Sequence, residues 1–132
     1  MLIRKPEQVT PQTMTMPGAE GVRMRLMVGR EDGAPNFAMR MFDVEPGGHT
    51  PLHQHNYEHE ILVLDGRGDV VDGDGGATRP IAAGDVLFIP ANQTHQFRNG
   101  SDRPLKFMCL VPTKFDCAGE CKATPEIGRA HV

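Results

Sequence analysis

Four histidines fall into two short segments of this chain. His53, His55 and His59 lie in the first segment, and His95 lies in the second, further along the chain. The chain has six histidines in all, so most of them are concentrated here. Neutral imidazole is the commonest metal ligand in proteins near physiological pH. The two segments together therefore predict one site for a divalent transition metal.

The geometry of β-strands explains how these side chains can meet. Successive side chains of a strand point to opposite faces, so His53 and His55 are expected to point the same way. His59 follows on that face if the residues before it form a short hairpin. We therefore expect four ligands, His53, His55, His59 and His95. The alternative is that Glu60 replaces His59, which requires a bulge because Glu60 is an odd number of residues from His55.

Imidazole ligands do not by themselves select one metal. Manganese, iron, nickel, zinc and copper all accept nitrogen ligands of this kind. Four neutral imidazoles leave the divalent charge uncompensated, whereas a Glu ligand cancels one unit of it. Such a site attracts anions, so we expect a small-molecule ligand that is anionic and chelates the metal through oxygen.

Composition places the site in a small all-β domain. A chain of 132 residues is long enough for one domain with an ordinary core. Its 15 Gly and 11 Pro favour many short strands joined by turns. The net charge of −3 gives no reason to expect a nucleic-acid partner.

Targeting signals and cysteine content lead to an expected location. The longest clean apolar run, at 61–64, is too short to span a bilayer, so no membrane partner is expected. Residues 1–6 show no apolar signal region. Three Cys is an odd number, which argues against a secreted disulfide framework. We therefore expect a cytoplasmic protein.

Short strand-like runs follow one another along most of the chain. They lie at 22–29, 37–45, 58–65, 69–72, 78–81, 86–90, 95–99 and 105–112. The sequence from Asp72 to Gly76 is the strongest hairpin turn. No segment shows a capped helical period of ten residues. This pattern predicts a jelly roll or barrel.

The first histidine segment resembles the first sequence motif of the cupin superfamily. Five residues separate Gly47 from His53, and six separate His59 from Gly66, as in that motif. His55 completes the motif's His-x-His, and His59 stands where the family usually has a Glu ligand.

The second histidine segment resembles the second cupin motif. Gly84, Pro90, His95 and Asn99 match it in type and spacing. Asn92 stands where Gly is usual, and Asn also tolerates the left-handed conformation of a turn. The resemblance covers residues 37–111 and is closest to small single-domain cupins of type 2 with an all-histidine metal site.

The resemblance implies a fold and a domain organisation. It implies an all-β single domain, the cupin jelly-roll β-barrel or double-stranded β-helix, with a metal near one open end. We place this barrel at 21–112, an N-terminal arm at 1–20 and a C-terminal tail at 113–132. Cupin-like barrels commonly pair through N-terminal strands, so a homodimer is expected.

The resemblance also implies a range of activities. Cupins with a complete ligand set include dioxygenases, decarboxylases, lyases and sugar isomerases. We expect a mononuclear metalloenzyme of dioxygenase-like or isomerase/lyase-like type, without assigning a catalytic residue. The alternative is a non-catalytic module that binds or senses a metal or a small ligand. A metal-free, epimerase-like cupin is disfavoured because such proteins usually lack the complete ligand set.

Several other residues are expected to lie in the barrel interior, and the role of two cysteines stays undecided. We expect Cys109 to be a buried core cysteine rather than a thiol that lines the pocket. Cys117 and Cys121 share a face on a helical turn, so a redox pair or second metal site competes with two ordinary thiols. The residues expected to line the barrel interior are Phe37, Met39, Met41, Ile61, Val63, Phe88, Phe97 and Phe107.

Overall fold

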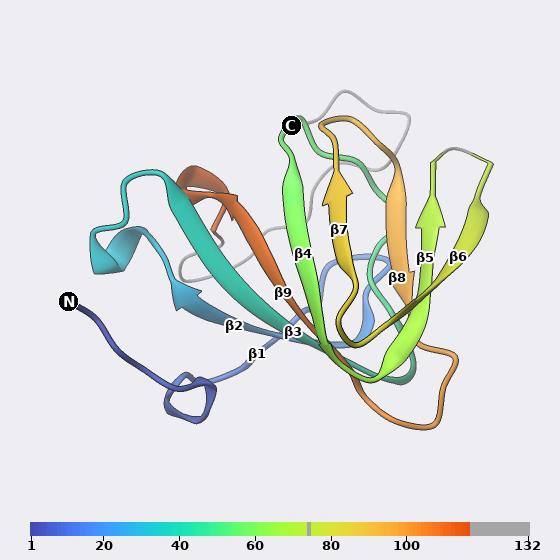
Figure 1. Ribbon diagram of the computed structural model, residues 1–132, viewed down its shortest axis with the longest axis horizontal. Coiled ribbons are helices and arrows are strands. Elements are labelled where there is room, and N and C mark those ends of the chain that lie inside the picture. Colours follow the sequence, from blue (N-terminus) through green and yellow to red (C-terminus); the bar gives the residue numbers. More distant parts are fainter. Residues whose placement is uncertain (74, 117–132) are drawn as a thin grey trace.

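The computed structural model describes residues 1–73 and 75–116, and strands dominate this part of the chain (Figure 1). The strands and 3-10 helices (η) are η1 (Pro6–Gln8), β1 (Gln12–Thr13), β2 (Glu20–Val28), η2 (Arg30–Asp32), β3 (Phe37–His49), β4 (His59–Asp65), β5 (Arg67–Asp72), β6 (Ala77–Ala82), β7 (Val86–Ile89), β8 (His95–Arg98), β9 (Leu105–Pro112) and η3 (Thr113–Phe115). Each of the eight predicted runs corresponds to one strand, from β2 to β9.

The strands form one curled antiparallel sheet. The order is β6-β5-β8-β3-β9-β4-β7, and β2 joins through β3 and carries β1. In Figure 1 the strands converge toward the lower edge and spread toward the upper edge. Strands β5 and β6 pair directly across the predicted hairpin turn, with Asp72 opposite Ala77. The all-β jelly roll predicted from the sequence is confirmed.

Stacked aromatic rings pack in the interior of the curled sheet. The ring centroids of Phe42 and Phe107 lie 5.2 Å apart, and those of Phe97 and Phe107 lie 4.6 Å apart. Burying each such side chain contributes about 1.5–3 kcal/mol to stability. Ile61 and Val63 of β4 belong to the same core. The interior positions predicted for these two residues and for Phe97 and Phe107 are confirmed.

The prediction for the inner face of β3 was wrong. Phe37 is 73 % exposed, and Met39 and Met41 are half-buried on the outer face, whereas Arg40 and Phe42 line the interior. Alternation separates the two faces of a strand but does not say which faces inward, and in β3 both faces carry large apolar residues.

Phe88 was also wrongly placed in the interior. It lies on β7 opposite Glu60 and is 59 % exposed. The buried neighbour on β7 is instead Ile89, which pairs with His59. Strand β7 is short and lies at the edge of the sheet order, so its outer side chains have no neighbouring strand beyond them.

Two turns between strands depend on unusual backbone conformations. Gly66 has φ 80°, and a Cβ at this position would collide with the carbonyl oxygen of Pro104. Asn92 has φ 68°, so it does adopt the left-handed conformation usually taken by Gly. Buried Asn99 donates from its amide to the Val44 and Arg103 carbonyl oxygens at 2.8 and 2.7 Å. These two hydrogen bonds hold the loop between β8 and β9 against β3.

The N-terminal arm packs along β2 of its own chain. Gln12 of β1 lies opposite Met24 of β2. The Arg25 Nε donates to the Val9 carbonyl oxygen at 3.3 Å. At the other end of the chain, the structure describes the predicted tail only as far as Asp116, which is fully buried and accepts hydrogen bonds from Arg30. The predictions for Cys117 and Cys121 fall outside the described residues.

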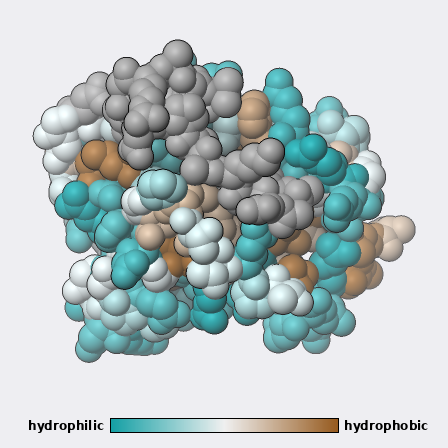
Figure 2. All heavy atoms as spheres, turned by 180° about the vertical axis from the view of Figure 1, so that it is seen from behind, coloured by the Kyte–Doolittle hydropathy of each residue, from teal (hydrophilic) through white to brown (hydrophobic). Residues whose placement is uncertain are grey.

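Hydrophilic side chains predominate on the face seen from behind, and hydrophobic residues form separate patches between them (Figure 2). None of the helices in the described part of the chain is long and apolar enough to cross a bilayer.

Candidate metal centre

His53 and His55 lie on the connection between β3 and β4, rather than on a continuous strand as expected. Two backbone hydrogen bonds hold this connection on β8: the His53 N–H donates to the His95 carbonyl oxygen at 3.1 Å, and the His95 N–H donates to that of His53 at 2.9 Å. Thr50 adds a side-chain anchor, because its Oγ1 accepts from the Phe97 N–H at 2.9 Å. The connection is therefore held by pairing with β8.

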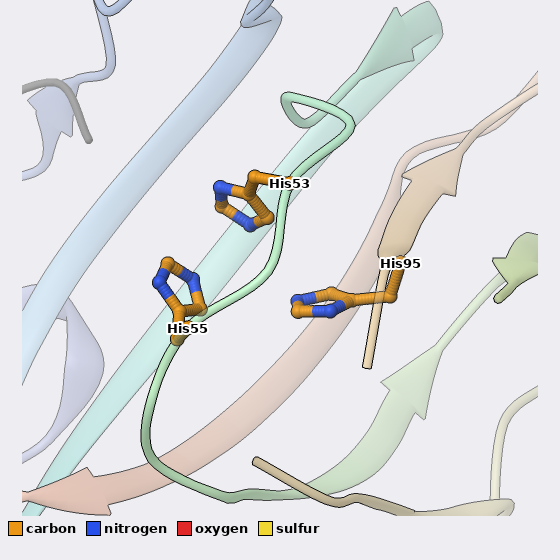
Figure 3. Close-up of side chains that lie close together, drawn as sticks. All are labelled: His53, His55 and His95. Carbon is orange, nitrogen blue, oxygen red and sulfur yellow. The ribbon is translucent and has the colours of Figure 1, made fainter. Parts of the chain in front are cut away.

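Three imidazoles gather around a common space (Figure 3). One ring nitrogen from each of His53, His55 and His95 lies within 4.8 Å of the corresponding nitrogens of the other two. The ring centroid of His53 lies 4.2 Å from that of His55 and 4.9 Å from that of His95. These three residues form the group best placed to hold a metal, and we call them the three-histidine group.

His59 borders this group without belonging to it. It opens β4, is 4 % exposed, and its ring centroid lies 4.9 Å from that of His55 and 5.3 Å from that of His95. Its Nδ1 lies 3.2 Å from the Cys109 sulfur. Glu60 is exposed on the outer face of β4, as alternation predicts. The role of His59 as a fourth ligand stays a prediction.

Burial keeps these imidazoles neutral. Desolvation lowers the pKa of His55, with further lowering from the neighbouring His53. Desolvation followed by the positive charge of Arg40 lowers the pKa of His59. The pKa of His95 is also lowered by burial, which outweighs the hydrogen bond from its Nδ1 to the Gln93 carbonyl oxygen. Neutral imidazole is the form that binds a metal.

In the part of the chain that the structure describes, buried ring nitrogens without a hydrogen-bond partner include Nδ1 of His55 and Nε2 of His59. Buried polar atoms in native proteins are almost always satisfied, so unpaired atoms beside a cavity require an explanation. A bound cation satisfies the lone pairs of neutral imidazoles. The residues present therefore fit a divalent transition metal.

The histidines line a cavity of about 310 Å³ whose other walls are mostly apolar. The described residues that line it include three cationic side chains and no Asp or Glu. Arg40 is the most buried of these cations, at 6 % exposure, and its guanidinium lies 5.1 Å from the Phe42 ring centroid. Arg40 was not predicted as a site residue, although a charged residue within an apolar strand is a signal for this position.

Aromatic side chains close one side of the cavity. The Tyr57 ring stacks on Phe115, with centroids 3.9 Å apart, and on His55, with centroids 4.8 Å apart. Phe115 belongs to η3 within the predicted tail, and nothing in its local sequence indicated a place at the site. Cys109 is 2 % exposed and also lines the cavity, so it is both a core cysteine and a pocket residue.

The chain has clear relatives among known proteins. The polyketide cyclase RemF from Streptomyces resistomycificus superposes with a TM-score of 0.82 and 34 % identity, covering 86 % of this chain and 80 % of that one. An oxalate-binding protein from Thermotoga maritima is 33 % identical over 117 residues, which are 84 % of this chain and 93 % of the relative.

A third relative is similar over a shorter region. The 1-methylthio-D-xylulose 5-phosphate methylsulfurylase from Rhodospirillum rubrum is 38 % identical over 78 residues, or 59 % of this chain. This match spans 49 % of the length of the methylsulfurylase.

A family model described as the cupin domain matches residues 40–111, which run from within β3 to near the end of β9 and include all four predicted ligands. That match covers more than half of the chain and agrees with the jelly roll and with the histidine positions. The chain therefore belongs to the cupin family.

Proposed function

We propose that this chain is a mononuclear metal-binding cupin that acts as an enzyme on a small anionic molecule chelated through two oxygens. The observation that carries the proposal is the position of the three-histidine group on the wall of a cavity whose described lining contains cations and no carboxylate. Neutral ligands leave the charge of a divalent metal uncompensated, so both the metal and Arg40 favour an anion.

The names of the relatives support this class of ligand. A polyketide, an oxalate and a xylulose phosphate each present oxygens close enough together to chelate one cation. A metal bound here would supply Lewis acidity or, if redox-active, electron transfer to dioxygen. The first role favours isomerase- or lyase-like chemistry, and the second favours dioxygenase-like chemistry.

The residues of the chain have separate tasks in this proposal. Arg40, which lines the cavity, binds the negative charge of the ligand, and the apolar walls exclude water around it. Desolvation raises the pKa of Tyr57, so its hydroxyl keeps its proton beside the histidines. Tyr57 lines the cavity, so this hydroxyl can donate a hydrogen bond to a ligand oxygen.

Metal analysis followed by calorimetry tests the proposal. The purified protein is expected to hold about one transition metal per chain, and to bind oxalate or a β-diketone more tightly than the matched neutral diamides. His55→Ala is expected to lose both metal and ligand binding, whereas the matched control His49→Ala keeps them. A wild-type protein that binds none of manganese, iron, nickel, zinc or copper, or that prefers the neutral ligands, contradicts the proposal.

Non-catalytic binding is the second candidate function. It is favoured by the absence of Asp and Glu from the described cavity lining, because a carboxylate is a common general base. Oxygen uptake and product analysis with candidate diketones separate the two functions. Turnover in any metal form supports the enzyme, and tight binding without turnover across the panel supports the binding module.

We also propose that two copies form a homodimer. The outer face of β3, β9 and β7 carries half-buried Met39, Met41 and Leu110 and exposed Phe88, although one face of an antiparallel sheet is usually polar when it meets water. A second copy packed on this face would bury it. Sedimentation is expected to show a dimer at micromolar concentration and a monomer for Phe88→Glu, with Thr78→Glu on β6 as the matched control. A monomeric wild type contradicts this.

A further inference from the structure

The Cys109 sulfur lies between two nitrogen-bearing side chains in the wall of the cavity. Its Sγ is 3.2 Å from the His59 Nδ1 and accepts from the Arg40 Nη2 at 3.7 Å. All three side chains are buried, at 2 %, 4 % and 6 % exposure respectively. A weak hydrogen-bonding group thus lies in contact with the imidazole whose place in the metal site is open.

The surroundings of the thiol decide which atom donates to which. The sulfur also lies 3.9 Å from the Leu110 carbonyl oxygen, which can only accept and is therefore available to the thiol proton. The Arg40 Nη2 can only donate, so it approaches a sulfur lone pair. The arrangement that uses all three contacts of the sulfur is therefore one in which the His59 Nδ1–H donates and the sulfur accepts.

This direction sets the tautomer of His59. With the proton on Nδ1, the lone pair lies on Nε2, which is buried beside the cavity and has no hydrogen-bond partner. The other tautomer would bury an unpaired N–H at the same place, which is unfavourable. His95 shows the same arrangement with a different acceptor, because its Nδ1 lies 2.9 Å from the Gln93 carbonyl oxygen.

We propose that Cys109 is a positioning residue that holds His59 in the Nδ1–H tautomer and so presents its Nε2 to the metal site as a ligand additional to the three-histidine group. Ligating histidines generally donate their second ring nitrogen to an acceptor that orients the ring. The usual acceptors are carboxylates and carbonyls, and here the acceptor is a thiol. This inference rests on the proposed metal binding for its functional consequence, but the tautomer itself does not.

Nitrogen NMR of the metal-free protein tests the tautomer directly. With ¹⁵N-labelled histidine above pH 7, His59 is expected to carry its proton on Nδ1 in the wild type and in Cys109→Ser, whose hydroxyl still accepts. In Cys109→Val and in Cys109→Ala, which adds no volume, the signals are expected to show a mixture of tautomers. His95 is the internal control and is expected to be unchanged in all variants.

Metal titration tests the consequence. Cobalt(II) is expected to bind Cys109→Val and Cys109→Ala about 10- to 100-fold more weakly than the wild type, with a d–d spectrum shifted toward that of His59→Ala. Cys109→Ser is expected to keep the wild-type spectrum. Val111→Ala, a buried change on the same face of β9, controls for loss of packing and is expected to leave the spectrum unchanged.

The outcomes separate this inference from the proposed function. Wild-type tautomer, affinity and spectrum in both Cys109→Val and Cys109→Ala would overturn the inference while metal binding stood. A wild type that binds no metal would overturn the proposed function, and the NMR comparison would still decide the tautomer. A serine variant that behaves like the valine variant would show that Cys109 acts through packing, which also overturns the inference.

Discussion

The histidines around the cavity are held in two different ways. His53 and His55 lie on an irregular connection, whereas His59 and His95 open strands β4 and β8. Backbone hydrogen bonds to β8 hold the connection. The rings of His59 and His95 instead have acceptors of their own, the Cys109 sulfur and the Gln93 carbonyl oxygen.

This difference shows where precision comes from at such a site. A strand determines which way a side chain points, and a hydrogen bond to the second ring nitrogen then sets its tautomer and rotation. On an irregular connection the backbone contacts that anchor it do more of this work, and ring contacts such as the stacking of Tyr57 on His55 add to them. We therefore expect the two pairs to respond differently to substitution and to loss of anchors.

The largest effect is expected from His95, which belongs to both arrangements. Its ring is part of the three-histidine group, and its backbone anchors His53. His95→Ala is expected to weaken metal binding by more than about 100-fold, the upper value for removing a residue that only orients a ligand. Titration with zinc and competing chelators measures this. A loss no greater than that of His49→Ala would show that the metal binds elsewhere.

Acid is expected to destabilise the metal-free protein, because buried histidines of both pairs resist protonation in the folded state. The pKa values of His55, His59 and His95 are lowered from 6.5 by burial, so below about pH 6.5 the unfolded chain binds more protons than the folded one. The contribution of these histidines to the free energy of unfolding is fully present above that pH. It falls as the pH drops, by up to about 1.4 kcal/mol per pH unit for each histidine.

Urea unfolding from pH 8 to pH 5 measures the acid effect. His59→Phe and His55→Phe are each expected to reduce the slope, and an excess of metal is expected to shift the loss to lower pH. A slope below pH 6.5 that neither substitution changes would contradict the buried, neutral state of these rings.

Loss of the Thr50 anchor is expected to affect the connection alone. Thr50→Val keeps the shape of the side chain but leaves the buried Phe97 N–H without its acceptor, which costs about 1–3 kcal/mol. Thermal unfolding measures the cost, and Thr78→Val on exposed β6 is the control. NMR signals of His53 and His55 are expected to shift more than those of His59. Equal shifts in both pairs would argue against separate anchoring.

The smallest effect is expected at Glu60. Glu60→Gln removes the charge of an exposed side chain on the outer face of β4. Metal affinity and the cobalt spectrum are expected to remain those of the wild type. A clear loss of affinity would instead make Glu60 a ligand in place of His59.

Much of this molecule could be predicted because the signals are local. Alternation and turn residues located eight strands, and Asn92 was expected to tolerate the left-handed turn that it adopts. The inward position of His59 and the outward position of Glu60 also follow from alternation. The placement of Phe37 and Phe88 failed because both faces of their strands are apolar, and period-two patterns do not identify the inner face.

The residue types and spacing of the site, the strands that flank it and the cupin motifs could all be recognised in the linear sequence. Other features appear only in the folded chain: β8 holds His53 and His55, Arg40 and Phe115 line the cavity, and Cys109 contacts His59. The physical reason is the range of the interactions. Side-chain direction along a strand is set by neighbouring residues, whereas burial, charge and hydrogen-bond partners depend on segments far apart in the chain.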